Sequence, residues 1–206
     1  MLRAAECREL TALFARDDVF RKRVSMGRHR FGEGDYGYFR EPLPAIVSEL
    51  RESLYARLAP IASRWSADLG QPGRFPATLS GWRRRCARAG QPHPTPLLLR
   101  YTEGGYNRLH QDLYGELSFP FQATVLLNRP DRDFSGGAFL LVENRPRQQS
   151  IGTAIPLECG EAVIFPVTER PVPGARGLLR ATIRHGMSRL DGGERYALGI
   201  IFHDAK

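Results

Sequence analysis

The second half of the chain is a series of short apolar segments separated by turn residues, and this pattern limits the fold more than any other feature. Glycine, proline and aspartate residues lie between consecutive segments. The segments cover residues 95–101, 121–128, 137–143, 161–167, 181–186 and 195–202. Regularly spaced short strands of this kind indicate an antiparallel sandwich or barrel.

The first two-fifths of the chain follows a helical pattern instead. Apolar positions between Leu10 and Phe20 predict a short amphipathic helix. A clearer one follows Pro44, where apolar residues recur at steps of three and four residues as far as Trp65. A third helix is expected at residues 76–89.

Residues 28–39 separate the first two helices, and their glycines and aromatic rings predict a loop, either an ordinary surface loop or one that clamps a base. The whole chain is expected to be one α+β domain, residues 1–206. Residues 1–93 would be mainly helical and packed on one sheet, and residues 94–206 would form a β double sheet.

The composition excludes several other classes of protein. No apolar run approaches the 18 residues of a membrane helix, and the first residues, which include acids, do not resemble a signal peptide. The three cysteines, Cys7, Cys86 and Cys159, are too scattered for a disulfide framework or a zinc knuckle. We therefore expect a cytoplasmic protein without a membrane contact.

The chain is strongly basic, with a formal net charge of +8, which favours a polyanionic partner. All of its 30 basic residues except Lys22 and Lys206 are arginine, a bias that a GC-rich genome also produces. The arginines gather in two places. The first basic cluster is Arg21, Lys22, Arg23, Arg28, His29 and Arg30, and the second is Arg83, Arg84, Arg85 and Arg88.

His110 and Asp112 are separated by one residue, which suits metal binding. On a strand, side chains at positions i and i+2 point to the same face, so this imidazole and carboxylate can converge on one ion. His185, on a late segment, is the best placed third ligand, because the other histidines lack a carboxylate at this spacing. Two histidines and one carboxylate form the facial triad of non-haem Fe(II) sites, which leaves coordination positions open.

Arg195 begins the last apolar segment, ten residues after His185. By alternation along a strand, Arg195 shares a face with Ala197 and Gly199, two small residues that leave room for a ligand. A buried guanidinium beside a cavity requires an anionic partner. A dicarboxylate supplies one through a bidentate, charge-assisted pair.

The triad followed by Arg195 resembles the signature of the Fe(II)/2-oxoglutarate-dependent oxygenases, whose fold is a double-stranded β-helix, or jelly roll. The spacing between His185 and Arg195 is similar to that of the prolyl-hydroxylase-like branch. Tyr101, nine residues before His110, is similar to a tyrosine that helps the AlkB repair oxygenases to hold 2-oxoglutarate. Over residues 95–205 the chain resembles most closely a family of small prokaryotic oxygenases, Oxygenase-NA, assigned to alkylated nucleic acid.

This resemblance implies Fe(II), 2-oxoglutarate and O2 as cofactors, with release of succinate and CO2. The catalytic and metal-binding residues would be His110, Asp112 and His185. The residues that hold 2-oxoglutarate would be Arg195, Tyr101 and Asn107. Arg189, four residues after the second histidine, is a competing candidate for the tail carboxylate.

The resemblance also implies a substrate, namely alkylated bases in single-stranded or damaged DNA or RNA, as in the repair of alkylation damage. Candidate substrate contacts are Arg28, Phe31, Tyr36, Tyr38, Tyr114 and Arg189. Two alternatives stay open: a hydroxylase of proteins (prolyl-type) or small molecules that uses the same cofactors, and a non-catalytic cupin-like metal-binding module. No obligate protein partner is expected.

Overall fold

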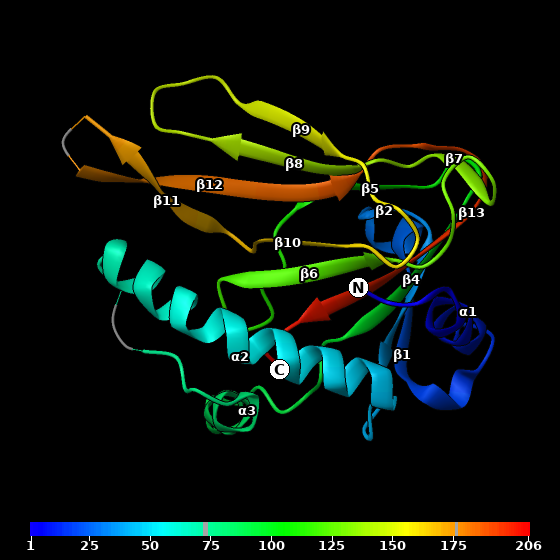
Figure 1. Cartoon of the computed structure of the whole chain (residues 1–206), viewed down its shortest axis with the longest axis horizontal. Coiled ribbons are helices and arrows are strands. Elements are labelled where there is room, and N and C mark those ends of the chain that lie inside the picture. Colours follow the sequence, from blue (N-terminus) through cyan, green and yellow to red (C-terminus); the bar gives the residue numbers. More distant parts are fainter. Residues whose placement is uncertain (72–73, 176) are drawn as a thin grey trace.

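Two antiparallel β-sheets face each other in the computed structural model, which describes residues 1–71, 74–175 and 177–206 (Figure 1). The large sheet has the strand order β1-β3-β4-β13-β6-β10, and β7 pairs with the beginning of β13. The small sheet has the order β2-β5-β12-β8-β9, and β11 pairs with the first half of β12. This arrangement confirms the predicted α+β jelly roll.

The strands of the large sheet are β1 (Phe20–Ser25), β3 (Asp35–Phe39), β4 (Leu97–Thr102), β6 (Phe121–Leu126), β7 (Phe134–Gly136), β10 (Ala162–Pro166) and β13 (Leu190–Ile201). The strands of the small sheet are β2 (Gly32–Glu33), β5 (Tyr106–His110), β8 (Phe139–Asn144), β9 (Ile151–Ile155), β11 (Glu169–Gly174) and β12 (Gly177–Met187). Each of the six apolar segments predicted from the sequence overlaps one of these strands.

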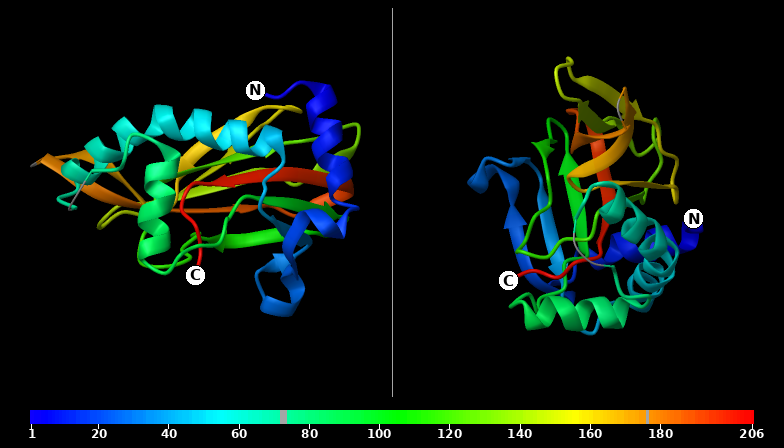
Figure 2. Two further views of the ribbon diagram at one scale, coloured as in Figure 1. Left: turned by 90° about the horizontal axis from the view of Figure 1, so that it is seen from below. Right: turned by 90° about the vertical axis from the view of Figure 1, so that its left-hand side faces the viewer.

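Three helices, α1 (Ala4–Leu13), α2 (Ala45–Asp68) and α3 (Leu79–Arg88), share one hydrophobic core with the large sheet. Figure 2 shows α2 and α3 on the outer face of this sheet. The C-terminal end of α2 also reaches the small sheet, where Arg180 of β12 donates to the carbonyl of Leu69. The helices predicted after Pro44 and at residues 76–89 are confirmed. Within the part of the chain that the structure describes, none of the helices has the length and apolar character needed to span a membrane.

Alternation along the central strands gives the large sheet two different faces. Val125, Leu198 and Ile200 point outwards into the core beneath the helices. Their neighbours Thr124 and Gly199 point inwards, towards the small sheet, and line a cavity between the two sheets. The helices therefore stabilise one face of the sheet, and the other face is left for a ligand.

Two expectations for the N-terminal part were wrong. The first helix ends at Leu13, because Phe20 belongs to β1 and stacks on Phe39 with ring centroids 5.2 Å apart. Residues 28–39 are not simply a loop, since they contain β2 and β3. Gly37 explains the second error: a Cβ there would lie 2.5 Å from the Phe20 ring, so this glycine lets an aromatic side chain cross the strand.

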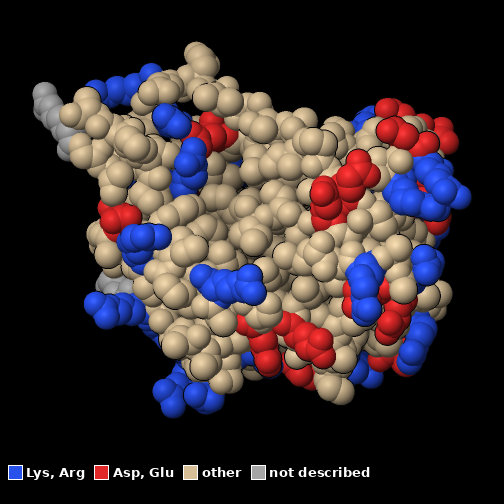
Figure 3. All heavy atoms as spheres, viewed as in Figure 1, with Lys and Arg blue, Asp and Glu red and all other residues tan. Residues whose placement is uncertain are grey.

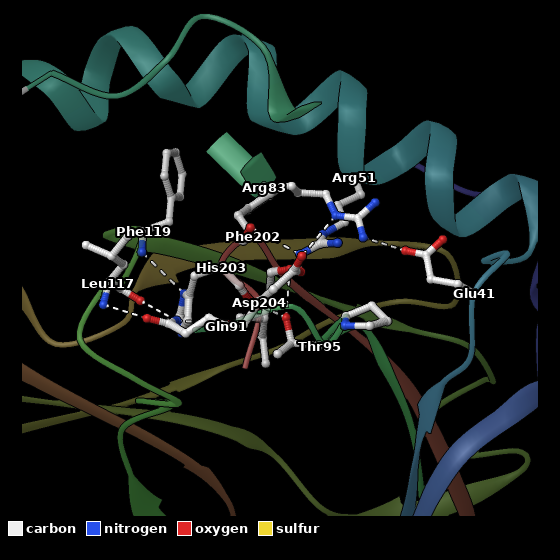
Figure 4. Close-up of polar contacts among 12 residues, drawn as sticks. Glu41, Arg51, Arg83, Gln91, Thr95, Leu117, Phe119, Phe202, His203 and Asp204 are labelled. Carbon is white, nitrogen blue, oxygen red and sulfur yellow. Dashed lines mark hydrogen bonds and ion pairs between the residues drawn. The ribbon is translucent and has the colours of Figure 1, made fainter. Parts of the chain in front are cut away.

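A polar network ties the segment after β13 to the helices (Figure 4). Arg51 of α2 donates to the backbone carbonyls of Ile201 and Phe202 and to Asp204 Oδ1, the last at 2.6 Å. Arg83 of α3 donates to the other carboxylate oxygen of Asp204 at 2.9 Å. Both Arg51 and Asp204 are almost completely buried, so the pair is shielded from solvent.

The same segment reaches the loop that follows β5. Burial lowers the pKa of His203 to about 4, and the neutral ring accepts a hydrogen bond at Nδ1 from the backbone N–H of Phe119. Gln91 connects the backbone of Leu117 to the carbonyl of Asp204. These contacts fix the end of the loop that begins at Asp112.

Candidate active site

The fold brings His110, Asp112 and His185 together at one end of the cavity. His110 on β5 and His185 on β12 are direct cross-strand partners, and their ring centroids are 4.2 Å apart. Asp112 lies two residues beyond the end of β5, not on the strand itself, and its Oδ2 is 3.3 Å from His185 Nε2. One ligand atom from each residue lies within 4.8 Å of the others, close enough to hold a metal ion.

Hydrogen bonds from outside the triad orient two of these side chains. His110 Nδ1 is 2.6 Å from the backbone carbonyl of Arg108, to which it donates, so Nε2 carries the free lone pair. The hydroxyl of Tyr114 donates to Asp112 Oδ1 at 2.7 Å, and Tyr38 in turn contacts the Tyr114 hydroxyl at 3.1 Å. The second carboxylate oxygen of Asp112 is therefore the one left for a metal.

The protonation states of the triad suit a cation. Burial alone would raise the pKa of the Asp112 carboxyl, but the interactions with His185, His110 and Tyr114 lower it well below its usual value. Burial and the neighbouring His185 lower the pKa of His110, which keeps its imidazole neutral. Metal ions require deprotonated carboxylates and neutral imidazoles, and these shifts favour that state for Asp112 and His110.

The cavity beside the triad has a volume of about 470 Å³ and is lined by both sheets. Of the residues predicted to contact substrate, Phe31, Tyr36, Tyr38 and Tyr114 line it. Arg28 is exposed on the short helical turn at residues 26–29 and is not among the lining residues. Three of the four aromatic side chains are half-buried in the wall, whereas Phe31 is 50% exposed at the mouth.

Arg195 lines the same cavity and is 3% exposed. Within the described part of the chain no carboxylate pairs with it, and its Nε has no hydrogen-bond partner. Burial lowers its pKa to about 10, so the guanidinium still carries its charge at neutral pH. Gly137, at φ +62°, allows this placement, because a Cβ there would lie 3.1 Å from the Arg195 side chain.

The other residues predicted to hold 2-oxoglutarate, Tyr101 and Asn107, line the same cavity. On β4, Tyr101 is the direct cross-strand partner of Arg195 and is 2% exposed. Burial raises the pKa of Tyr101, and Arg195 and Asn107 partly offset that shift. Arg189 is placed differently: it is exposed between β12 and β13, where Nη1 donates to the carbonyl of Gly104 at 2.8 Å. It does not line the cavity.

This arrangement fits Fe(II), 2-oxoglutarate and O2. Two imidazole nitrogens and one carboxylate oxygen form the donor set that non-haem Fe(II) oxygenases use, with coordination positions left open. The uncompensated charge of Arg195, with its unpartnered Nε, suits the tail carboxylate of a diacid. The cavity joins the two positions, so one small molecule can reach both.

Some polar side chains of this region were missed by the sequence analysis. Gln122 contacts the His185 ring, and Gln111 donates to the backbone carbonyls of Thr168 and Ile183. His203 was set aside because it lacks a carboxylate at strand spacing, yet it supports the loop of Asp112. Gln111 lies between two members of the triad in the sequence, but its partners do not, and Gln122 and His203 come near the triad only in the folded chain.

Comparison with known proteins agrees with this geometry. Residues 34–205 match the Oxygenase-NA family, described as "Oxygenase, catalysing oxidative methylation of damaged DNA". Two curated relatives from strains of Mycobacterium tuberculosis, both named only as uncharacterized proteins, are 48% identical over 164 residues, which cover 80% of this chain and 70% of each relative.

Solved structures of prolyl hydroxylases share the fold. A Pseudomonas putida prolyl-4-hydroxylase aligns with a TM-score of 0.52 and 15% identity, covering 96% of this chain and 85% of that one. A viral collagen prolyl hydroxylase from Paramecium bursaria chlorella virus 1 aligns with a TM-score of 0.53 and 15% identity, covering 96% and 89%. At this identity the likeness concerns the fold alone. Since the family match extends over most of the chain, the protein belongs to the Oxygenase-NA family and is an Fe(II)/2-oxoglutarate oxygenase.

Proposed function

We propose that this protein removes alkyl groups oxidatively from the bases of DNA or RNA, with release of succinate and CO2. The observation that carries the proposal is one cavity whose lining includes the His–Asp–His triad, an uncompensated arginine and a wall of aromatic side chains. The family description, which names damaged DNA, supports the same substrate class. The cytoplasmic location expected from the sequence stays a prediction.

In this proposal His110, Asp112 and His185 hold the iron through Nε2, a carboxylate oxygen and Nε2. When bound, iron and 2-oxoglutarate supply the activation of O2 that hydroxylates a substrate C–H bond, while the acid is oxidised to succinate and CO2. The chain itself orients the reactants: Arg195 pairs with the tail carboxylate, and Tyr101 and Asn107 enclose that end of the acid. A hydroxylated N-methyl group then leaves as formaldehyde, which restores the base and its N–H.

The mouth of the cavity combines aromatic, apolar and basic side chains. Tyr36 and Tyr38 form a wall in which the two rings meet edge to face, with centroids 5.3 Å apart. Phe31 stacks on His29 at the rim, and the cations Arg30 and Arg108 line the cavity beside it. Aromatic faces for bases and cations for phosphates are the usual elements of single-strand binding.

The overall positive charge adds less to this argument than the sequence suggested. On the face shown in Figure 3 basic and acidic side chains are interspersed and form no continuous basic surface. Both basic clusters also serve the fold, since Arg83 is paired with Asp204 and Glu41, and Arg23 is paired with Asp17. The rim of the cavity is therefore the part of the surface that we assign to nucleic acid.

The test uses single-stranded DNA and RNA oligonucleotides that carry N-methylated bases. We expect succinate and formaldehyde in equal amounts. Replacing Arg30 and Arg108 together by alanine should weaken binding and reduce the slope of log Kd against log salt by about 0.7 for each lost phosphate contact. The matched control replaces Arg84 and Arg88, two exposed arginines of α3 outside the cavity, and should change neither quantity.

Two outcomes would count against the proposal. Absence of turnover with every oligonucleotide of the panel would contradict the proposed nucleic-acid substrate but not the oxygenase activity. An equal loss of oligonucleotide affinity in the Arg30/Arg108 and Arg84/Arg88 variants would contradict the proposal that the rim of the cavity binds nucleic acid.

A protein or small-molecule hydroxylase is the second candidate, favoured by the spacing of ten residues between His185 and Arg195. Stimulation of succinate release by a proline-containing peptide, and not by any oligonucleotide, would support it. Its binding should also be nearly independent of salt. The non-catalytic cupin-like module does not agree with membership of an oxygenase family.

Arg195→Met should weaken 2-oxoglutarate binding roughly a hundredfold, because it removes a bidentate, charge-assisted pair. Iron binding without the acid should stay unchanged, since Arg195 lies away from the triad. Anaerobic titration of the Fe(II) protein, followed by the visible charge-transfer band of the chelated acid, measures both. Arg189→Met is the matched control and should keep wild-type affinity; the reverse result would move the assignment to Arg189.

Tyr114→Phe should weaken Fe(II) binding about tenfold, because loss of a hydrogen bond to a metal ligand typically costs ten- to a hundredfold in affinity. The hydroxyl that this change removes donates to Asp112 Oδ1. Tyr106→Phe on β5 serves as control, since its ring contacts Arg189 and Arg108 and does not line the cavity. Equal Fe(II) affinities of the two variants in a competition titration would contradict the assigned role of Tyr114.

A further inference from the structure

Gln122, on β6, is a buried amide whose carbonyl oxygen is left unpaired. The side chain is 2% exposed and lines the cavity, and its Oε1 has no hydrogen-bond partner among the residues that the structure describes. Its Nε2 lies 3.1 Å from His185 Nε2 and 3.5 Å from His185 Nδ1. The lone pairs of the two ring nitrogens point in divergent directions, so an atom at similar distances from both lies over the face of the ring. Whichever way the amide is turned, it stacks on the imidazole and makes no good hydrogen bond with it.

Other buried or half-buried amides of the chain are used by the protein itself. Gln91 binds the backbone at Leu117 and Asp204 through both of its ends. Asn128 binds the backbone of β13 through both of its ends. A buried amide without such partners is destabilising, and native proteins seldom keep one unless a ligand completes it. The nitrogen and oxygen of an amide exchange places by a half-turn of the side chain, so the unpaired end of Gln122 can present its NH2 group to a molecule in the cavity.

The register of the large sheet shows which end of a bound acid Gln122 can reach. Gln122 is the cross-strand partner of Ile201 on β13. Arg195 lies six residues earlier on the same strand, about 20 Å away at the rise of an extended chain. Both side chains line the cavity, but at this separation along the sheet they cannot share one carboxylate. Gln122 belongs to the end at which His185 lies.

We propose that Gln122 is a positioning residue that donates a hydrogen bond from its amide to an oxygen atom at the keto-acid end of 2-oxoglutarate. This inference rests on the proposed metal site and on the orientation of the acid with its tail at Arg195. It gives the acid a second fixed point next to His185, so that both ends are held by side chains of the large sheet. This role of Gln122 does not depend on which substrate the enzyme hydroxylates.

The test compares Gln122→Met, which keeps the volume and removes the amide, with Gln122→Glu, which places an anionic acceptor beside the acid. Both Fe(II)-loaded variants are titrated anaerobically with 2-oxoglutarate, and the visible charge-transfer band gives the Kd and the band position. We expect Gln122→Met to raise the Kd roughly ten- to a hundredfold and to shift the band. Gln122→Glu should raise the Kd further, because two carboxylates then face each other.

The internal control is Fe(II) binding without the acid, which Gln122→Met should leave unchanged. An unchanged Kd and band in Gln122→Met would overturn the proposal. A Kd in Gln122→Glu equal to or below that of Gln122→Met would overturn it as well, since an anionic acceptor at this position would then not repel the acid. If the wild-type protein shows no charge-transfer band at all, the proposed metal and 2-oxoglutarate sites are overturned instead. A lack of turnover with nucleic acid would not affect this experiment, because the titration contains no substrate.

A measurement on the unmutated protein guards against a variant that fails to fold. With Zn(II) in place of iron, the side-chain amide protons of glutamine are observed by NMR on an ¹⁵N-labelled sample. Addition of 2-oxoglutarate should shift one buried glutamine NH2 pair downfield and slow its exchange with solvent. No change in any glutamine NH2 pair at saturating acid would overturn the role assigned to Gln122.

Discussion

Asp112→Ala is expected to abolish both the charge-transfer band and succinate formation. The substitution removes the only anionic donor of the triad and leaves two neutral imidazoles for the cation. Loss of a hydrogen bond to a metal ligand already costs about ten- to a hundredfold in affinity, so loss of the ligand itself should cost more. Anaerobic Fe(II) titration and a succinate assay under air measure the two effects.

Asp68→Ala is the control for this prediction, because Asp68 is an exposed aspartate at the end of α2, outside the cavity. It should behave as the wild type in both assays. His185→Ala should reproduce the loss seen in Asp112→Ala, since it also removes one of the three proposed metal ligands. A band of normal intensity in Asp112→Ala would show that the iron is bound elsewhere.

Asp204→Ala should lower the free energy of unfolding by about 3–5 kcal/mol, the usual effect of removing one partner of a buried ion pair. Arg51 is 1% exposed and would keep its charge without a carboxylate beside it. Arg83 would lose the same partner, although it is closer to solvent. Urea unfolding followed by fluorescence and circular dichroism gives the change directly.

Glu41→Ala provides the comparison, because Glu41 binds the same Arg83 but is about half exposed. An exposed pair of this kind contributes only about 0–1 kcal/mol. A similar loss of stability in both variants would contradict the view that burial makes the Asp204 pair important. Because Asp204 follows His203, which supports the loop of Asp112, its replacement should also weaken iron binding.

The strands that the sequence predicted well are those such as β6 and β13, whose residues alternate between the core beneath the helices and the cavity. The missed strands include β1 and β3 of the large sheet and β9 and β11 of the small sheet. Residues of β9 are almost all exposed, and β11 contains Pro171 and Pro173, which are tolerated because this strand pairs only with β12. Such segments carry no apolar alternation, so their pairing depends on the neighbouring strand.

The site was predictable as far as residue types at fixed spacing could describe it. The inward position of Arg195 follows from alternation on one strand and agrees with its place in the cavity. The support that Tyr38 gives to Tyr114 does not follow in this way, because 76 residues separate the two hydroxyls. Contacts over such distances depend on how the strands are ordered in the sheet, which the spacing of residues does not contain.

The central place of β13 has a consequence for synthesis of the protein. β13 pairs with β4 on one side and with β6 on the other, yet it is the last of the three to leave the ribosome. Until then the nascent chain carries two strand edges with unpaired backbone groups, the kind of surface that chaperones shield from aggregation. Arg195 lies on this same strand. An unfinished chain that already contains all three metal ligands therefore still lacks the arginine that we propose binds the tail carboxylate of 2-oxoglutarate.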